Sequence, residues 1–188
     1  MIQGNPILVI AGSVRARRVS MQTATWIAGL GREAVALPFE VVDLKDWPLP
    51  MDDEPEMPQG GVYTRDHTRD WSHKIALAAG LVFVTPQYNW GYPAPLKNAL
   101  DHLHGEWAGK PAMIVTYGGH GGGRCGEQLR QVCQALHMAV VPTRPELVLA
   151  RERIEANAGE IDPAAEFGRH TGVLRQALGE LAAEVTKA

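Results

Sequence analysis

Residues 12–20, GSVRARRVS, place hydroxyl and guanidinium groups between an apolar run and a helical pattern. Free backbone amides and the dipole at a helix N-terminus favour an anion, and these side chains would strengthen that preference. Neither GxGxxG nor GxxxxGK[ST] occurs in this segment, which favours a monophosphate over a pyrophosphate or ATP. The alternative is that Ser20 only caps the helix and the arginines are solvated. The donor side chains are Ser13, Ser20, Arg15, Arg17 and Arg18.

A second unusual segment, residues 85–93, reads TPQYNWGYP and joins another apolar run to another helical pattern. Loops usually carry small polar residues, because connecting segments lie in water. This loop instead contains Tyr88, Trp90 and Tyr92. A flat aromatic ligand could stack beside Tyr88 or Trp90 while backbone groups of residues 87–90 bond its polar edge. The alternative is that Trp90 and Tyr92 fill a subunit contact.

A third segment, residues 116–126, reads TYGGHGGGRCG and has five glycines at positions 118–123. Glycine lets the backbone approach a flat ligand closely, and free amides there can donate to an anion. A flexible turn is the alternative. A phosphate loop, an aromatic wall and a glycine wall together suit a phosphorylated flat heterocycle, and FMN satisfies all three.

Continuous apolar runs separated by helical periodicity predict an α/β fold. The predicted strands cover residues 6–11, 39–44, 81–85, 111–117 and part of 138–149, where Pro142 and Pro145 blur the limits. The predicted helices cover 21–30, 64–79 with Thr64 as a possible cap, 95–103, 127–137 and 163–185. This pattern predicts a flavodoxin-like, doubly wound, five-stranded parallel sheet in the order 2-1-3-4-5, with helices on both faces. The three unusual loops then open at one edge, outside the carboxyl ends of the strands.

The composition is that of a single globular domain over residues 1–188, with 45% hydrophobic and 21% charged residues. A net charge of -3 gives no basic excess, so neither nucleic acid nor a membrane is an expected partner. No stretch reaches bilayer length, and the first residues lack a basic leader. Residues 46–61 are acidic and proline-rich and predict a surface excursion. Cys125 and Cys133 are too far apart on a predicted helix for a disulfide, which favours the reducing cytoplasm.

The chain resembles the NADPH-dependent FMN reductase family, and especially its soluble NAD(P)H:quinone reductase branch. The matching segments are GSVRARRVS, DWPLPMDDEP, TPQYNWGYPAPLKNALDHLHGEWAGKPA and TYGGHGGGRCGEQLRQV, in the family's order. The resemblance implies noncovalently bound FMN and a homodimer or tetramer with the flavin near the subunit contact. It assigns the phosphate to Ser13, Arg15, Arg18, Val19 and Ser20. It assigns the flavin ring to Pro86, Gln87, Tyr88, Asn89 and Trp90 on one edge, and to Tyr117, Gly118, Gly119 and Gly122 on the other.

The expected activity is hydride transfer from NADPH or NADH through bound FMN to a quinone, free flavin or similar small acceptor. The cofactor does this chemistry, so no catalytic side chain is predicted beyond the flavin. Amides of Gly118 and Gly119 are expected to stabilise negative charge on the reduced ring. Two alternatives stay open: a flavodoxin-like electron carrier and a flavin-binding redox sensor, both without NAD(P)H turnover.

The histidines and cysteines predict no metal site. His102 and His104 point in different directions on a predicted helix, so they are assigned to the surface or to a dimer contact. His120 could contact the flavin or the acceptor. Cys125, at a predicted helix start, is expected to be a buried, unreactive thiol, with a lowered pKa as the alternative.

Overall fold

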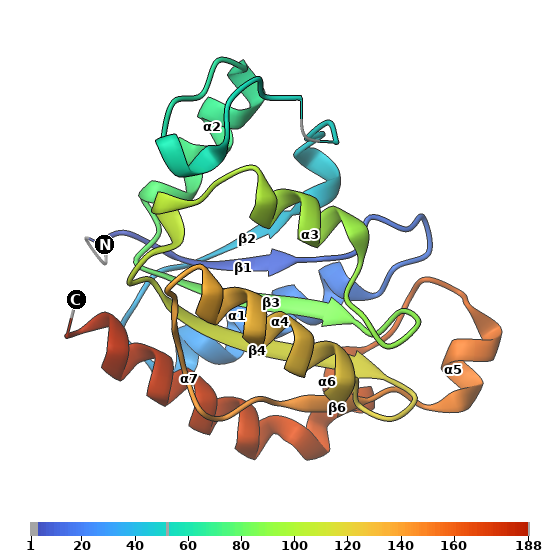
Figure 1. Cartoon of the computed structure of the whole chain (residues 1–188). Helices are drawn as coiled ribbons and strands as arrows, with labels where there is room; N and C mark the ends of the chain where they lie inside the picture. Colours follow the sequence, from blue (N-terminus) through green and yellow to red (C-terminus); the bar gives the residue numbers. More distant parts are fainter. Residues whose placement is uncertain (1–3, 52, 188) are drawn as a thin grey trace.

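The fold is a parallel α/β sheet, described by a computed structural model for residues 4–51 and 53–187 (Figure 1). β1 (Ile7–Ala11) lies between β2 (Phe39–Asp43) and β3 (Gly80–Pro86), and β4 (Pro111–Gly118) pairs with the other side of β3. The order β2-β1-β3-β4-β5 confirms the predicted flavodoxin-like topology. Residues 1–3, 52 and 188 belong to the predicted domain but lie outside the described residues. Residues 1–3 are part of the predicted N-terminal segment, and residue 52 is part of the acidic excursion.

The fifth strand is divided into β5 (Ala139–Val140) and β6 (Glu146–Val148), both parallel to β4. Pro142 and Pro145 lie between the two parts, and proline has no N–H to donate to a sheet. The strand lies where it was predicted but is not continuous. β6 pairs with the carboxyl-terminal half of β4, so the chain after β6 emerges at the same edge as the loops after β1, β3 and β4.

Helices cover both faces of the sheet, and each strand contributes side chains to two separate cores (Figure 1). Ile7 and Val9 of β1 point to the face covered by α1 and α7, whereas Leu8 and Ile10 point to the face covered by α2, α3 and α4. Burial on both faces explains why the strands read as uninterrupted apolar runs. The helices are α1 (Ser20–Ala34), α2 (Asp66–Ala76), α3 (Ala94–Asp101), α4 (Gly123–Ala135) and α7 (Thr171–Val185).

α1 and α3 each begin one residue before the predicted start, and two other helices begin two or more residues away from it. α2 begins at Asp66, because the Thr64 hydroxyl donates to Glu54 at 2.8 Å and does not cap the helix. α4 begins earlier than predicted, at Gly123, directly after the left-handed residue Gly122. The first turn of α4 is therefore built from the end of the glycine loop.

The C-terminal part of the chain forms two helices where one was predicted. α6 (Pro163–Phe167) is followed by a short 3-10 turn at Gly168–His170 and then by α7. The buried Phe167 belongs to the same core as the inner face of α7, so the interruption keeps both helices against the sheet. In the described part of the chain, no helix combines the length and the apolar character needed to cross a membrane.

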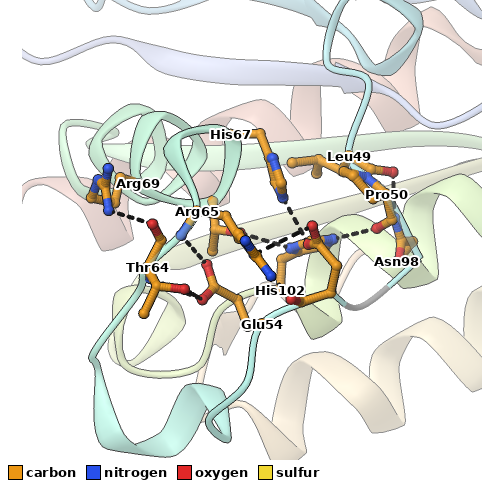
Figure 2. Close-up of polar contacts among 11 residues, drawn as sticks. Leu49, Pro50, Glu54, Thr64, Arg65, His67, Arg69, Asn98 and His102 are labelled. Atoms are coloured by element: carbon orange, nitrogen blue, oxygen red, sulfur yellow. Dashed lines mark hydrogen bonds and ion pairs between the residues drawn. The ribbon is translucent and has the colours of Figure 1, made fainter.

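The acidic excursion after β2 is tied down by side chains from α2 and from the α3 region (Figure 2). Asn98 donates to the carbonyls of Leu49 (3.0 Å) and Pro50 (3.1 Å). His102 Nε2 donates to the same Pro50 carbonyl at 2.7 Å, and its Nδ1 lies 3.2 Å from the Thr68 hydroxyl. His102 is buried, so its predicted surface position is wrong. Its ring instead connects the excursion to α2.

Glu54 anchors the middle of the excursion through hydrogen bonds that depend on pH (Figure 2). Its carboxylate accepts hydrogen bonds from the Thr64 N–H and hydroxyl and from the Arg65 N–H, at 2.8 to 2.9 Å. Desolvation raises the pKa of Glu54, but these hydrogen bonds lower it more, from 4.5 to about 2. Ionised Glu54 therefore stabilises the fold fully above pH 4.5, and this contribution is lost as the pH falls towards about 2.

We expect Glu54→Gln to lower the free energy of unfolding by about 1 kcal/mol near neutral pH, a modest effect because water screens the carboxylate. The deficit should shrink as the pH falls from 4.5 to about 2, since the wild-type protein then loses the same charge. Urea unfolding at a series of pH values measures both effects. Glu56→Gln in the same segment is the control, and a deficit at Glu54 that does not change with pH would contradict this interpretation.

Candidate functional site

A cavity of about 310 Å³ opens at the carboxyl edge of the sheet, where the loops after β1, β3, β4 and β6 meet. Nine of the fourteen predicted cofactor-binding residues line it: Arg15, Arg18, Val19, Pro86, Gln87, Tyr88, Tyr117, Gly118 and Gly119. The other five lie outside the lining: Ser13, Ser20, Asn89, Trp90 and Gly122. The fold therefore brings the three unusual loops to one site.

Arg18 is held in the first loop by an ion pair with Asp43, the last residue of β2. The two side chains are only 13% and 8% exposed, so the pair is largely withdrawn from water. Arg18 also donates to the carbonyl of Arg15 at 3.2 Å, which steadies the turn of the loop. Its Nε is buried without a partner among the described residues. Arg18 thus keeps one free donor, although Asp43 compensates its charge.

Arg15 and Arg17, from the same loop as Arg18, also line the cavity. The guanidinium carbon of Arg15 lies 3.6 Å from the centre of the Tyr88 ring, and Arg17 donates to the Asn157 carbonyl at 3.3 Å. Within residues 4–51 and 53–187, neither arginine forms an ion pair with a carboxylate. This end of the cavity is therefore suited to an anion.

The two serines predicted for the phosphate are buried and join neighbouring segments. Ser13 Oγ lies 2.8 Å from the Tyr88 hydroxyl, which links the first loop to the second. Ser20 is the first residue of α1, and its hydroxyl donates to the Ser13 carbonyl at 3.3 Å instead of capping the helix. Both serines thus shape the loop from outside the cavity lining.

The aromatic segment folds into a tight turn that is closed by two hydrogen bonds between Tyr88 and Gly91, at 2.8 and 2.9 Å. Asn89 (φ 48°) and Trp90 (φ 71°) at its centre both have positive φ, as a type I′ turn requires. This conformation is unusual for a side chain as bulky as tryptophan. Trp90 is largely exposed, with the Arg124 guanidinium 3.5 Å from its ring centre. The turn therefore presents Tyr88 to the cavity and Trp90 to solvent.

The glycines of the third loop fall into two groups. Gly118 and Gly119 line the cavity, where the missing side chains leave the backbone accessible. Gly122 has a φ of 86°, and a Cβ there would lie 2.9 Å from the Cβ of Thr116. Only glycine fits at this position without strain. Gly122 consequently sets the start of α4 rather than contacting the cavity.

The ionisable groups near the third loop give no nucleophile or metal centre. Burial raises the pKa of Tyr117, and it raises that of Cys125 to about 12. The predicted burial of the Cys125 thiol is confirmed, and the direction of the pKa shift is opposite to the alternative of a lowered pKa. His120 is exposed and lies outside the cavity lining. In residues 4–51 and 53–187, no group of three His, Cys, Asp or Glu side chains is placed to bind a metal.

Residues 149–161 form a fourth wall of the cavity that sequence reasoning missed. This segment follows β6 and contains the short helix α5 (Arg151–Ala156). A Cβ at Gly159 would lie 2.8 Å from the Cα of Arg17, so the fourth wall touches the first loop backbone to backbone. Gln22 of α1 donates to the Gly159 carbonyl at 3.0 Å and fixes this contact. One sequence signal was available, since a fifth parallel strand delivers its following loop to the same edge.

Comparisons with known proteins agree with this arrangement. The model of the NADPH-dependent FMN reductase family matches residues 6–149. An NAD(P)H-dependent FMN reductase from Schizosaccharomyces pombe is 56% identical over 176 residues, which cover 93% of this chain and 87% of that protein. A 2-hydroxy-1,4-benzoquinone reductase from Burkholderia sp. is 33% identical over 167 residues, covering 80% and 82%. The solved flavoenzyme FerB, an NAD(P)H:(acceptor) oxidoreductase from Paracoccus denitrificans, shares the fold with a TM-score of 0.73 at 18% identity, covering 97% and 98%.

Proposed function

The chain belongs to the NADPH-dependent FMN reductase family, and we propose that it transfers hydride from NAD(P)H through bound FMN to a quinone, free flavin or similar small acceptor. The observation that carries the proposal is the cavity at the sheet edge, where Arg15 and Arg17 form no ion pair with the described residues and lie beside a tyrosine and bare glycine backbone. FMN combines a charged phosphate with a flat, polar-edged ring, and this cavity offers partners for both.

The residues around the cavity fit FMN. Arg15 and Arg17 would hold the phosphate, and the buried Nε of Arg18 would add one donor. Tyr88 and the backbone of the glycine loop would lie along the ring. Arg18 would mainly orient the first loop, because Asp43 already compensates its charge. The predicted contacts of the five residues outside the lining stay predictions.

The protein would bind and orient FMN, and the bound flavin would supply the hydride chemistry. Backbone amides of the glycine loop can stabilise charge without losing a proton. Tyr117 and Cys125 stay protonated near neutral pH, because burial raises the pKa of each. We therefore propose no side chain that transfers a proton.

Comparison of FMN with riboflavin tests the assignment of the two ends of the cavity. Both ligands contain the same ring, but only FMN carries a phosphate. We expect the flavin-free protein to bind FMN at least about 100-fold more tightly, since two charge-assisted hydrogen bonds contribute about 1.5 kcal/mol or more each. Quenching of flavin fluorescence measures both affinities. Equal affinities would contradict a phosphate site.

We further propose that the protein acts in the cytoplasm as a homodimer or tetramer, with no nucleic-acid or membrane partner. The net charge of -3 and the resemblance to the family support this proposal. Analytical ultracentrifugation of the FMN-loaded protein tests the oligomeric state, and a monomer at micromolar concentration would argue against it.

A further inference from the structure

The fourth wall adds another arginine to the cavity, Arg153 of α5. We propose that Arg153 binds a phosphate group of the nicotinamide nucleotide and so contributes to the choice of hydride donor. This inference rests on the proposed function, because it concerns the second ligand of the same cavity.

Arg153 is oriented by a carboxylate that leaves its outer nitrogens available. Its Nε donates to Glu166 Oε2 at 3.3 Å, while Glu166 Oε1 accepts from the Ala150 N–H at 2.8 Å. The Glu166 side chain is 11% exposed and that of Arg153 is 59% exposed, so a buried anchor holds a solvent-facing guanidinium. No partner for the two terminal nitrogens is found within residues 4–51 and 53–187. Such an oriented pair of donors matches the geometry with which arginine recognises phosphate.

The position of Arg153 separates it from the end of the cavity proposed for the FMN phosphate. The segment touches the phosphate loop further along the chain, where Gly159 lies against Arg17. Ile154, next to Arg153, instead approaches the glycine loop, since its Cδ1 would lie 3.4 Å from a Cβ at Gly119. This contact places Ile154, and with it the backbone of the preceding Arg153, beside the glycine loop that is proposed to lie along the flavin ring.

Arg153 and Ile154 together match the two chemical parts of a nicotinamide nucleotide. Ile154 is exposed and lines the cavity, so it offers an apolar contact to a flat ring. Arg153 offers donors to a phosphate beside it. Arg15 and Arg17 are the residues proposed to bind the FMN phosphate. Arg153 is therefore left to bind a second anionic ligand. That phosphate is either the 2′-phosphate of NADPH or the pyrophosphate that both nucleotides carry.

Titration calorimetry of the FMN-loaded protein with NADP⁺ and with NAD⁺ tests the inference. Arg153→Ala is expected to weaken nucleotide binding roughly 10-fold or more and to leave the Kd for FMN unchanged. A loss confined to NADP⁺ identifies the 2′-phosphate, whereas equal losses identify the pyrophosphate. Arg151→Ala is the matched control: Arg151 is in the same helix, is 86% exposed, pairs with Glu155 and lies outside the cavity lining.

Arg153→Lys shows whether a loss of affinity arises from misfolding, because lysine keeps the positive charge beside Glu166 but lacks the planar guanidinium group. Its nucleotide affinity should fall between those of the wild type and Arg153→Ala. Unchanged affinity in Arg153→Ala, an equal loss in Arg151→Ala, or weakened FMN binding would overturn the inference. Failure of the proposed function has a different signature, since NADPH would then not reduce the flavin of the wild-type protein.

Discussion

Replacing Arg15 and Arg17 together with alanine is expected to release FMN, so that the double variant purifies without colour. Both guanidinium groups line the cavity, and among the described residues neither forms an ion pair, although Glu160 is also in the lining. Each charge-assisted hydrogen bond contributes about 2 kcal/mol, so their joint loss raises the Kd for FMN roughly a thousand-fold. Fluorescence titration of the flavin-free variant measures this change.

A matched pair of arginines that do not line the cavity controls for the loss of charge. Arg151→Ala combined with Arg175→Ala removes the same net charge, and neither residue lines the cavity. This control should retain FMN with wild-type affinity. A yellow Arg15→Ala, Arg17→Ala protein with one FMN per chain would refute the assignment of the first loop to the phosphate.

Asp43→Asn is expected to lower the free energy of unfolding by about 3 kcal/mol, because it leaves the guanidinium of Arg18 without its carboxylate. Both side chains are nearly buried, so water cannot replace the lost partner. The change should also weaken FMN binding, since Arg18 steadies the turn that carries Arg15. Urea unfolding measures the stability, and fluorescence titration measures the affinity.

Asparagine is the informative replacement because it can still accept the hydrogen bond that Asp43 accepts from the Lys45 N–H, at 3.0 Å. The variant therefore isolates the loss of charge. Asp101→Asn is the control, since Asp101 pairs with Lys97 on an exposed helix face and should contribute less than about 1 kcal/mol. Similar changes at the two positions would contradict the importance of the buried pair.

Most of the sheet could be predicted from the sequence because its strands are buried on both faces and read as continuous apolar runs. The same pattern predicts parallel strands and therefore a common edge for the loops that follow them. The fifth strand was harder, because Pro142 and Pro145 divide it. The starts of α2 and α4 depended on a contact with Glu54 and on a left-handed glycine, neither of which periodicity reveals.

The sequence was sufficient to predict which three loops form the site, but not which residues contact one another there. From the sequence, Asp43 is only a polar residue near the end of a predicted strand. The pairing of β2 with β1 places it beside Arg18. His102 reads as a surface residue of a helix, yet the excursion folds over it. Trp90 reads as part of an aromatic wall, but the geometry of its turn exposes it to solvent. The first two differences depend on contacts between residues far apart in the sequence, whereas the third depends on a local turn between Tyr88 and Gly91.

Anaerobic mixing of the FMN-loaded protein with NADPH, followed by the visible absorption of the flavin, tests the proposed function most directly. We predict that the flavin bleaches in proportion to the NADPH added, and that its absorption returns when menadione is supplied. The same preparation should then oxidise NADPH continuously in the presence of menadione. A flavin that remains oxidised in excess NADPH would contradict the account, and would instead favour an electron carrier or a redox sensor.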